Sequence, residues 1–148
     1  IYPTPLGVII FSVGITRNNL LGCIFVSNRI KNKPDTFDVI SGDDGITFPL
    51  INLGAVGVIS VIGNALPLEF GRMVRLALNG ENESARTIHH KFTELFKLLF
   101  VDGNPAGVKA MLHSMGLIEN ELRLPLVPTR ITTLEKIRSI VQELNIRC

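Results

Sequence analysis

Two adjacent carboxylates are the first residues of this chain whose types and spacing could do chemistry. Asp43 and Asp44 stand between glycines in the stretch SGDDGITFPLINL, residues 41–53. Paired carboxylates can act as general acid and base or bind a metal ion. Adjacent residues on a loop diverge, and no His or third carboxylate stands at ligand spacing from this pair. We therefore expect the pair to stabilise the loop, with Asp44 capping a helix over Ile46–Leu53.

Other nucleophilic or metal-binding side chains lie further along the chain. His89 and His90 are adjacent on an expected helix and point about 100° apart, whereas a helical metal pair needs a spacing of four residues. His113 lies beside an apolar stripe, which favours a partly buried structural role. Lys109 lies beside the same stripe, on a helix and not at the strand end where an imine-forming lysine is expected.

The composition indicates one domain with a real core and excludes several classes of partner. The 15 basic and 13 acidic residues are scattered and give a net charge of +2, so no nucleic acid or anionic lipid partner is expected. No apolar run reaches the roughly 20 residues of a membrane span. The two cysteines, Cys23 and Cys148, make neither a disulfide framework nor a metal knuckle, so a cytoplasmic location is expected.

The first part of the chain differs in composition from the rest. All 13 acidic residues lie at or after Asp35, and the only charged residues among positions 1–34 are Arg17, Arg29, Lys31 and Lys33. The chain also starts with Ile and not with Met. We expect residues 1–29 to be atypical, with an N-terminus that is processed, truncated or misread.

Strand and helix patterns alternate over residues 6–79 and then give way to helices alone. A parallel α/β sheet, open or closed into a barrel, is therefore expected over residues 1–80, and a helical domain over residues 81–148. The expected strands are Leu6–Ile15, Phe37–Ser41 and Gly57–Ile62. The expected helices are Leu20–Lys33, Ile46–Leu53, Pro67 to Asn79, Glu81–Phe100, Pro105 to Gly116, and a last helix opened by a capping box at Thr132 and Glu135.

Two long stretches resemble a known family when taken together. They are IKNKPDTFDVISGDDGITFPLINLGAVGVISVIGN (residues 30–64) and DGNPAGVKAMLHSMGLIENELRLPLVP (residues 102–128). In this order and spacing they resemble the C-terminal half of dihydrodipicolinate synthase, also called 4-hydroxy-tetrahydrodipicolinate synthase.

The resemblance implies the C-terminal part of a (β/α)8 barrel, about three strands, followed by a three-helix extension. It also implies a lyase of lysine and diaminopimelate biosynthesis that condenses pyruvate with aspartate semialdehyde through a Schiff base, assembles as a homotetramer and needs no cofactor. Gly42 and Ile59 match positions that line the family's pyruvate pocket. A glycine lets the backbone approach a small keto acid, and an isoleucine wall excludes water.

The residue that does the family's chemistry does not carry over. Counting back without gaps from Lys33 and Pro34, the imine lysine position is occupied by Arg17, which cannot form the imine because arginine stays protonated. We expect weak or lost pyruvate binding and no aldolase activity of this chain alone. Residues 1–29 fit either a frameshifted stretch or a degenerate paralogue, and the abrupt boundary favours the frameshift.

Two other functions stay open at this level. One is a pyruvate-dependent aldolase of the N-acetylneuraminate lyase type, which acts on another aldehyde. The other is a non-catalytic assembly module whose helical tail pairs with itself or with full-length synthase.

Overall fold

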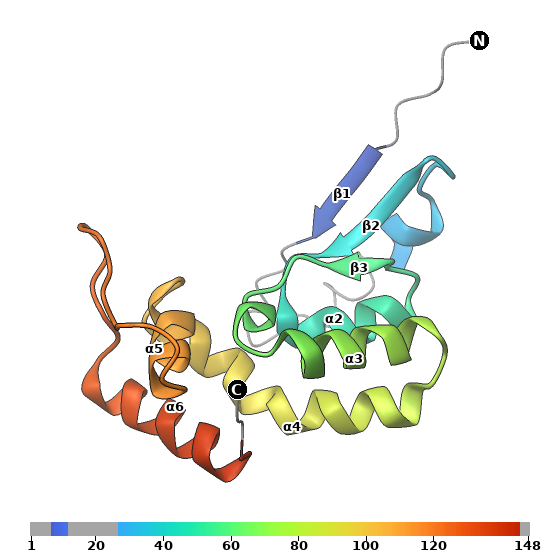
Figure 1. Cartoon of the computed structure of the whole chain (residues 1–148). Helices are drawn as coiled ribbons and strands as arrows, with labels where there is room; N and C mark the ends of the chain where they lie inside the picture. Colours follow the sequence, from blue (N-terminus) through green and yellow to red (C-terminus); the bar gives the residue numbers. More distant parts are fainter. Residues whose placement is uncertain (1–6, 12–26, 146–148) are drawn as a thin grey trace.

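The computed structural model describes residues 7–11 and 27–145, and within these a three-stranded parallel sheet precedes a series of helices (Figure 1). The strands are β1 (Gly7–Phe11), β2 (Phe37–Ser41) and β3 (Gly57–Val58), in the order β1-β2-β3. Residues 27–31 form a helix before β2. The predicted parallel sheet is thereby confirmed, while most of the predicted helix Leu20–Lys33 lies outside the described residues.

The register places the carboxyl ends of the strands at one edge. Phe11 pairs with Ser41, and Ser41 pairs with Val58. β3 is shorter than the predicted strand Gly57–Ile62. The hydrogen-bond ladder continues past Val58 to the amide of Ile59, which donates to the Ser41 carbonyl at 2.8 Å. Beyond Ile59 the chain turns into the 3-10 helix η1 (Ile62–Asn64), because the next amides are bonded by a side chain and not by a strand.

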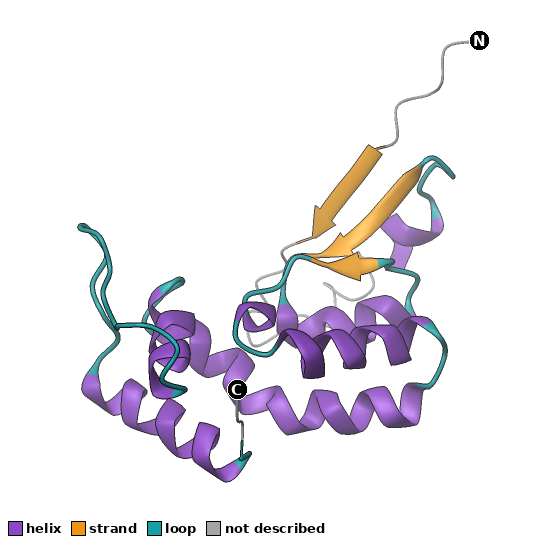
Figure 2. Cartoon of the chain, viewed as in Figure 1, coloured by secondary structure: helices purple, strands orange, loops and turns teal. Residues whose placement is uncertain are grey.

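Helices stack on one side of the strands (Figure 2). α2 (Asp44–Asn52) packs against β2 and β3, and α3 (Pro67–Leu78) packs against α2 and η1. α2 begins two residues earlier than predicted, so Pro49 lies inside the helix and not near its first turn. α3 begins and ends as predicted, with Pro67 in its first turn and Phe70 among its buried residues.

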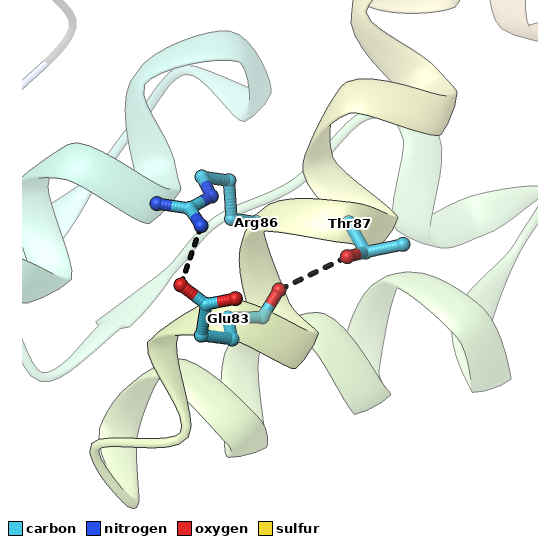
Figure 3. A network of polar contacts seen from close by, with 3 residues as sticks. All are labelled: Glu83, Arg86 and Thr87. Atoms are coloured by element: carbon cyan, nitrogen blue, oxygen red, sulfur yellow. Dashed lines mark hydrogen bonds and ion pairs between the residues drawn. The ribbon is translucent and has the colours of Figure 1, made fainter.

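α4 (Asn82–Val101) contacts both α2 and α3 and is the longest described helix. Its first turn carries an exposed ion pair in which Arg86 Nη2 lies 2.6 Å from Glu83 Oε1, and Thr87 Oγ1 donates to the Glu83 carbonyl (Figure 3). An exposed pair of this spacing contributes only about 0.3–0.5 kcal/mol. The predicted apolar stripe of this helix is confirmed, since Phe92, Leu95 and Leu99 are buried.

α5 (Ala106–Ser114) and α6 (Ile131–Glu143) complete the helical tail. The predicted capping box is wrong, because α6 begins at Ile131 and Thr132 lies in its first turn, with Arg130 as the N-cap. The carboxylate at the end of α4 takes over the capping role: Asp102 Oδ2 accepts from the Arg130 amide at 3.1 Å, and Oδ1 accepts from Arg130 Nε at 2.7 Å.

One apolar core runs through all the helices from α2 to α6. It contains Ile51, Phe70, Leu95, Met111 and Ile137, among other buried residues. A smaller cluster of Val39, Leu50 and Ala55 lies between the sheet and α2. The sheet and the helical tail are therefore held in a fixed relation by packing, and the carboxyl ends of the strands face the start of α5.

Candidate functional site

The loop after β2 is built by a buried hydroxyl network. Ser41 Oγ donates to the Asp43 carbonyl at 2.8 Å, and Thr47 Oγ1 lies 2.8 Å from the same carbonyl and 3.1 Å from Ser41 Oγ. Ser41 and Thr47 are both fully buried. Because these bonds close around the loop, they hold the backbone at Gly42 beside the strand end.

The two aspartates have different roles, and the predicted helix cap is assigned to the wrong one. Asp43 is the N-cap of α2, and its Oδ1 accepts from the Gly45 amide at 2.8 Å. Asp44 lies inside the first turn and is 1% exposed. The prediction that the pair stabilises the loop agrees with the cap made by Asp43, whereas Asp44 forms its hydrogen bonds with a more distant part of the fold.

Asp44 connects the loop after β2 to the loop after β3. Its Oδ2 accepts from the Val61 amide at 3.0 Å and from the Ile62 amide at 2.8 Å. Its Oδ1 is buried without a hydrogen bond of good geometry from the described residues. Burial raises the pKa of the Asp44 carboxyl, while the Ser60 hydroxyl and the two amides act in the opposite direction.

An open cavity of about 640 Å³ lies at the carboxyl ends of β2 and β3. Both predicted pocket residues, Gly42 and Ile59, line it. The rest of its wall comes from the loop after β3 and from the helical tail, as Ser60, Val61, Asn64, Phe100, Asn104, Pro105, Val108 and Leu112. The site is thus a junction between the sheet and the start of α5.

The cavity wall is neutral, and its polar groups are hydroxyl and amide. Ser60 Oγ accepts from the Gly63 amide at 2.7 Å, and Asn64 Nδ2 donates to the Val61 carbonyl at 3.0 Å. None of the described lining residues carries a charge. Ile59 is 57% exposed, so the water exclusion expected of it needs a covering group beyond the described lining.

The remaining candidates lie away from this cavity. His89 packs between the rings of Phe48 and Phe96, with centroid distances of 5.6 and 5.4 Å. Burial, with repulsion from His90, lowers the pKa of His89. No group of three or more potential metal ligands exists within the described part of the chain.

The other two side chains singled out by the sequence hold the connector after α5. Lys109 Nζ donates to the Glu121 carbonyl, and His113 Nδ1 lies 3.1 Å from the Ile118 carbonyl. His113 is partly buried, as predicted, and Lys109 does not line the cavity. Arg17, Cys23 and Cys148 lie outside the described residues. Among those described, no helix has the length and apolar character of a membrane span.

The sequence did not reveal the contribution of the helical tail to the cavity, or the bond between Asp44 and the loop after β3. The sequence predicts a helix start at Asn104 and Pro105 and a family resemblance that includes them, but it does not predict that both residues line the cavity. No local pattern predicts the Asp44 bonds, because their partners lie 17 and 18 residues further along.

Comparison with known proteins agrees with the geometry. The profile of the Dihydrodipicolinate synthetase family matches residues 16–144. The 4-hydroxy-tetrahydrodipicolinate synthase of Phocaeicola vulgatus is 80% identical over 119 residues, which are 80% of this chain and 40% of that protein. The chain therefore spans about two fifths of the length of this curated relative.

Solved structures match in three dimensions as well. Dihydrodipicolinate synthase from Aquifex aeolicus superposes with a TM-score of 0.83 at 36% identity, over 95% of this chain and 45% of that one. The chloride-inhibited dihydrodipicolinate synthase from Acinetobacter baumannii, solved in complex with pyruvate, gives a TM-score of 0.77 at 34% identity over 82% and 42% of the two chains.

Proposed function

Because the chain belongs to the Dihydrodipicolinate synthetase family, we propose that it supplies one side of a pyruvate pocket of the 4-hydroxy-tetrahydrodipicolinate synthase type. The fold, part of a TIM barrel with a helical extension, places the cavity at the carboxyl ends of the strands, where such barrels have their active sites. The observation that carries the proposal is that Gly42 and Ile59, 17 residues apart, line this one cavity.

The reaction proposed for a complete pocket is the condensation of pyruvate with aspartate semialdehyde, a step towards lysine and diaminopimelate. A lysine amine would attack the pyruvate ketone and form an imine with loss of water. Loss of a proton from the methyl group would then give an enamine, whose carbon adds to the aldehyde. Gly42 would let pyruvate approach the backbone, and Ile59 would form an apolar wall. Because the described lining is neutral, the charged and nucleophilic groups of a complete pocket would come from the rest of the barrel.

This chain by itself is proposed to be inactive, because Arg17 occupies the position expected for the imine lysine. The purified chain would be incubated with pyruvate and borohydride and then weighed by mass spectrometry, with the intact Phocaeicola vulgatus synthase as positive control. We expect an adduct on the control only. A reduced pyruvate adduct on this chain would overturn the proposal, and Lys109→Arg would show whether that residue carries it.

A chimera tests the contribution of the pocket residues directly. Residues 30–148 would replace the matching part of the Phocaeicola vulgatus synthase, which supplies the remainder of its barrel. We expect the chimera to be active and Gly42→Val to lower kcat/KM by about tenfold or more through a steric block. Gly71→Ala on α3 is a matched control, because the new Cβ would approach only the flexible end of Arg75.

A second candidate is a non-catalytic assembly module that pairs with itself or with full-length synthase in the cytoplasm. Three apolar side chains of the connector after α5 favour it: Leu124 is 86% exposed, Val127 63% and Leu126 46%. Exposed apolar groups that are contiguous in sequence are typical of association surfaces. An aldolase of the N-acetylneuraminate lyase type is tested with the chimera, by offering other aldehydes as acceptors.

A further inference from the structure

The cavity has two strand-end walls, and they come from different loops. Gly42 lies on the loop after β2, whereas Ile59, Ser60 and Val61 lie on the loop after β3. The ladder between the two strands ends with the Ile59 amide, which donates to the Ser41 carbonyl at 2.8 Å. Past that bond, the backbone of the second loop is tied to the first loop by Asp44, through its bonds to Val61 and Ile62.

Other roles for the Asp44 carboxyl do not fit its surroundings. The cap of α2 is Asp43. No ion pair reaches Asp44, and no metal-binding cluster includes it, within the described part of the chain. Its buried Oδ2 accepts two amides at the start of η1, where helical N–H groups have no partner of their own.

We infer that Asp44 is a positioning residue of the cavity, which sets the wall of Ile59, Ser60 and Val61 in a fixed place relative to Gly42. The inference rests on the proposed function in one respect, that the cavity is the ligand site. Its structural basis is independent of that, because the carboxylate bridges two loops whose positions the ladder alone does not determine.

The fixed separation of the two cavity walls matters most for a ligand as small as a keto acid. Such a ligand would contact both walls at once, and its affinity would depend on their separation to within a fraction of an ångström. Asp44 does not line the cavity, so it would act through the Val61 and Ile62 amides and not through the ligand.

Hydrogen exchange of the complete chain tests the bridge. In the unmodified chain, the Val61 and Ile62 amides are expected to be protected like amides of the ladder. Asp44→Leu removes the acceptor at similar volume and should speed exchange at both amides by about tenfold or more. Asp44→Asn keeps an acceptor oxygen and should restore protection. Val141→Ala, which opens the core in α6 away from the cavity, controls for general destabilisation.

Three results would overturn the inference: unprotected Val61 and Ile62 amides in the unmodified chain, unchanged exchange in Asp44→Leu, or the same local change in Val141→Ala. The first of these does not depend on whether Asp44→Leu folds.

Pyruvate titration of the chimera with the Phocaeicola vulgatus synthase, followed by the amide signals of Gly42 and Ile59, separates the inference from the proposed function. If both hold, Asp44→Leu weakens pyruvate binding by about tenfold while Asp44→Asn and Val141→Ala do not. Absence of pyruvate binding in the chimera without further substitution would contradict the proposed pocket role, and the exchange results on the complete chain would still decide the role of Asp44. Pyruvate binding that Asp44→Leu leaves unchanged would overturn the inference and leave the proposed function intact.

Discussion

Asp43 and Asp44 are chemically identical neighbours, and the difference in their burial gives them different structural roles. Asp43 is partly exposed and caps α2 through the Gly45 amide, the role that the sequence prediction gave to Asp44. Asp44 is buried, and its two backbone bonds cross to the loop after β3. His89 is a comparable case on α4, since it is packed between two apolar rings and its Nδ1 has no hydrogen-bond partner among the described residues.

Replacing His89 tests whether this histidine contributes to the pH dependence of folding stability. Burial lowers the pKa of His89 below its usual 6.5, so the unfolded chain takes up the proton first. Stability is complete above pH 6.5 and falls as pH decreases towards the folded-state pKa. We expect His89→Phe to flatten this fall, so that the gain in unfolding free energy over the unmodified chain is larger at pH 5.5 than at pH 8.

Chemical denaturation between pH 5 and 8 measures the change, with the exposed neighbour substituted as His90→Gln for comparison. An unchanged pH slope in His89→Phe would show that another group controls the acid side.

The helices of the tail are connected at two close contacts. The backbone of α5 approaches α4 so closely that a Cβ on Gly107 would lie 2.1 Å from the Leu99 carbonyl oxygen. The Asp102 carboxylate, at the end of α4, caps α6 through Arg130. The first contact sets the position of α5, whose Val108 and Leu112 form part of the far wall of the cavity.

Paired glycine substitutions should change stability in opposite directions. Gly107→Ala forces α4 and α5 apart and is expected to cost about 1–3 kcal/mol. Gly71→Ala, inside α3, gains helix propensity of up to about 1 kcal/mol, since its Cβ would approach only the side-chain end of Arg75. Thermal unfolding of the two variants measures the two stability shifts. Equal shifts would contradict the close approach of α4 and α5.

Asp102→Ala is expected to loosen the start of α6. Hydrogen bonds from Thr133 and from Arg130, with its positive charge, lower the pKa of Asp102, so its contribution is present above pH 3.8 and is lost as pH falls through the lowered pKa. At neutral pH, hydrogen exchange of the Arg130 amide should be several-fold faster in Asp102→Ala than in the unmodified chain. At acid pH the difference between the two chains should become smaller. Protection of this amide in Asp102→Ala would contradict the capping role.

At the scale of the whole molecule, the described residues contain three parallel strands and one large helical core. The helices cover one side of the sheet (Figure 1). Ile59, at the carboxyl end of the strands, stays largely exposed. A closed barrel of this type has eight strands, and three cannot close. Exposed sheet edges and apolar side chains favour association with another chain.

Size-exclusion chromatography tests that association. We expect the chain to elute above its monomer mass of 16.3 kDa and to co-elute in part with the intact Phocaeicola vulgatus synthase. Leu124→Glu and Val127→Glu place charges on the connector and should reduce any complex that uses this surface. Elution as a monodisperse monomer, with no co-elution with the synthase, would contradict the assembly-module candidate.

The sequence by itself determined the order of the elements and the family. Apolar periodicity and Pro67 were enough to place α3, and the resemblance of residues 30–64 and 102–128 to a known family implied the barrel type. Local patterns suffice for these features because neighbouring residues decide where a helix or strand begins and ends.

Only the tertiary structure decided the end of β3, the roles of Asp44 and Asp102, and the joining of the sheet and the tail around one cavity. These features depend on bonds between residues 17 and 28 positions apart, as in Asp44–Val61 and Asp102–Arg130. The energy of such bonds comes from burial and from amides that the fold brings within reach, and neither is visible in a local window of sequence.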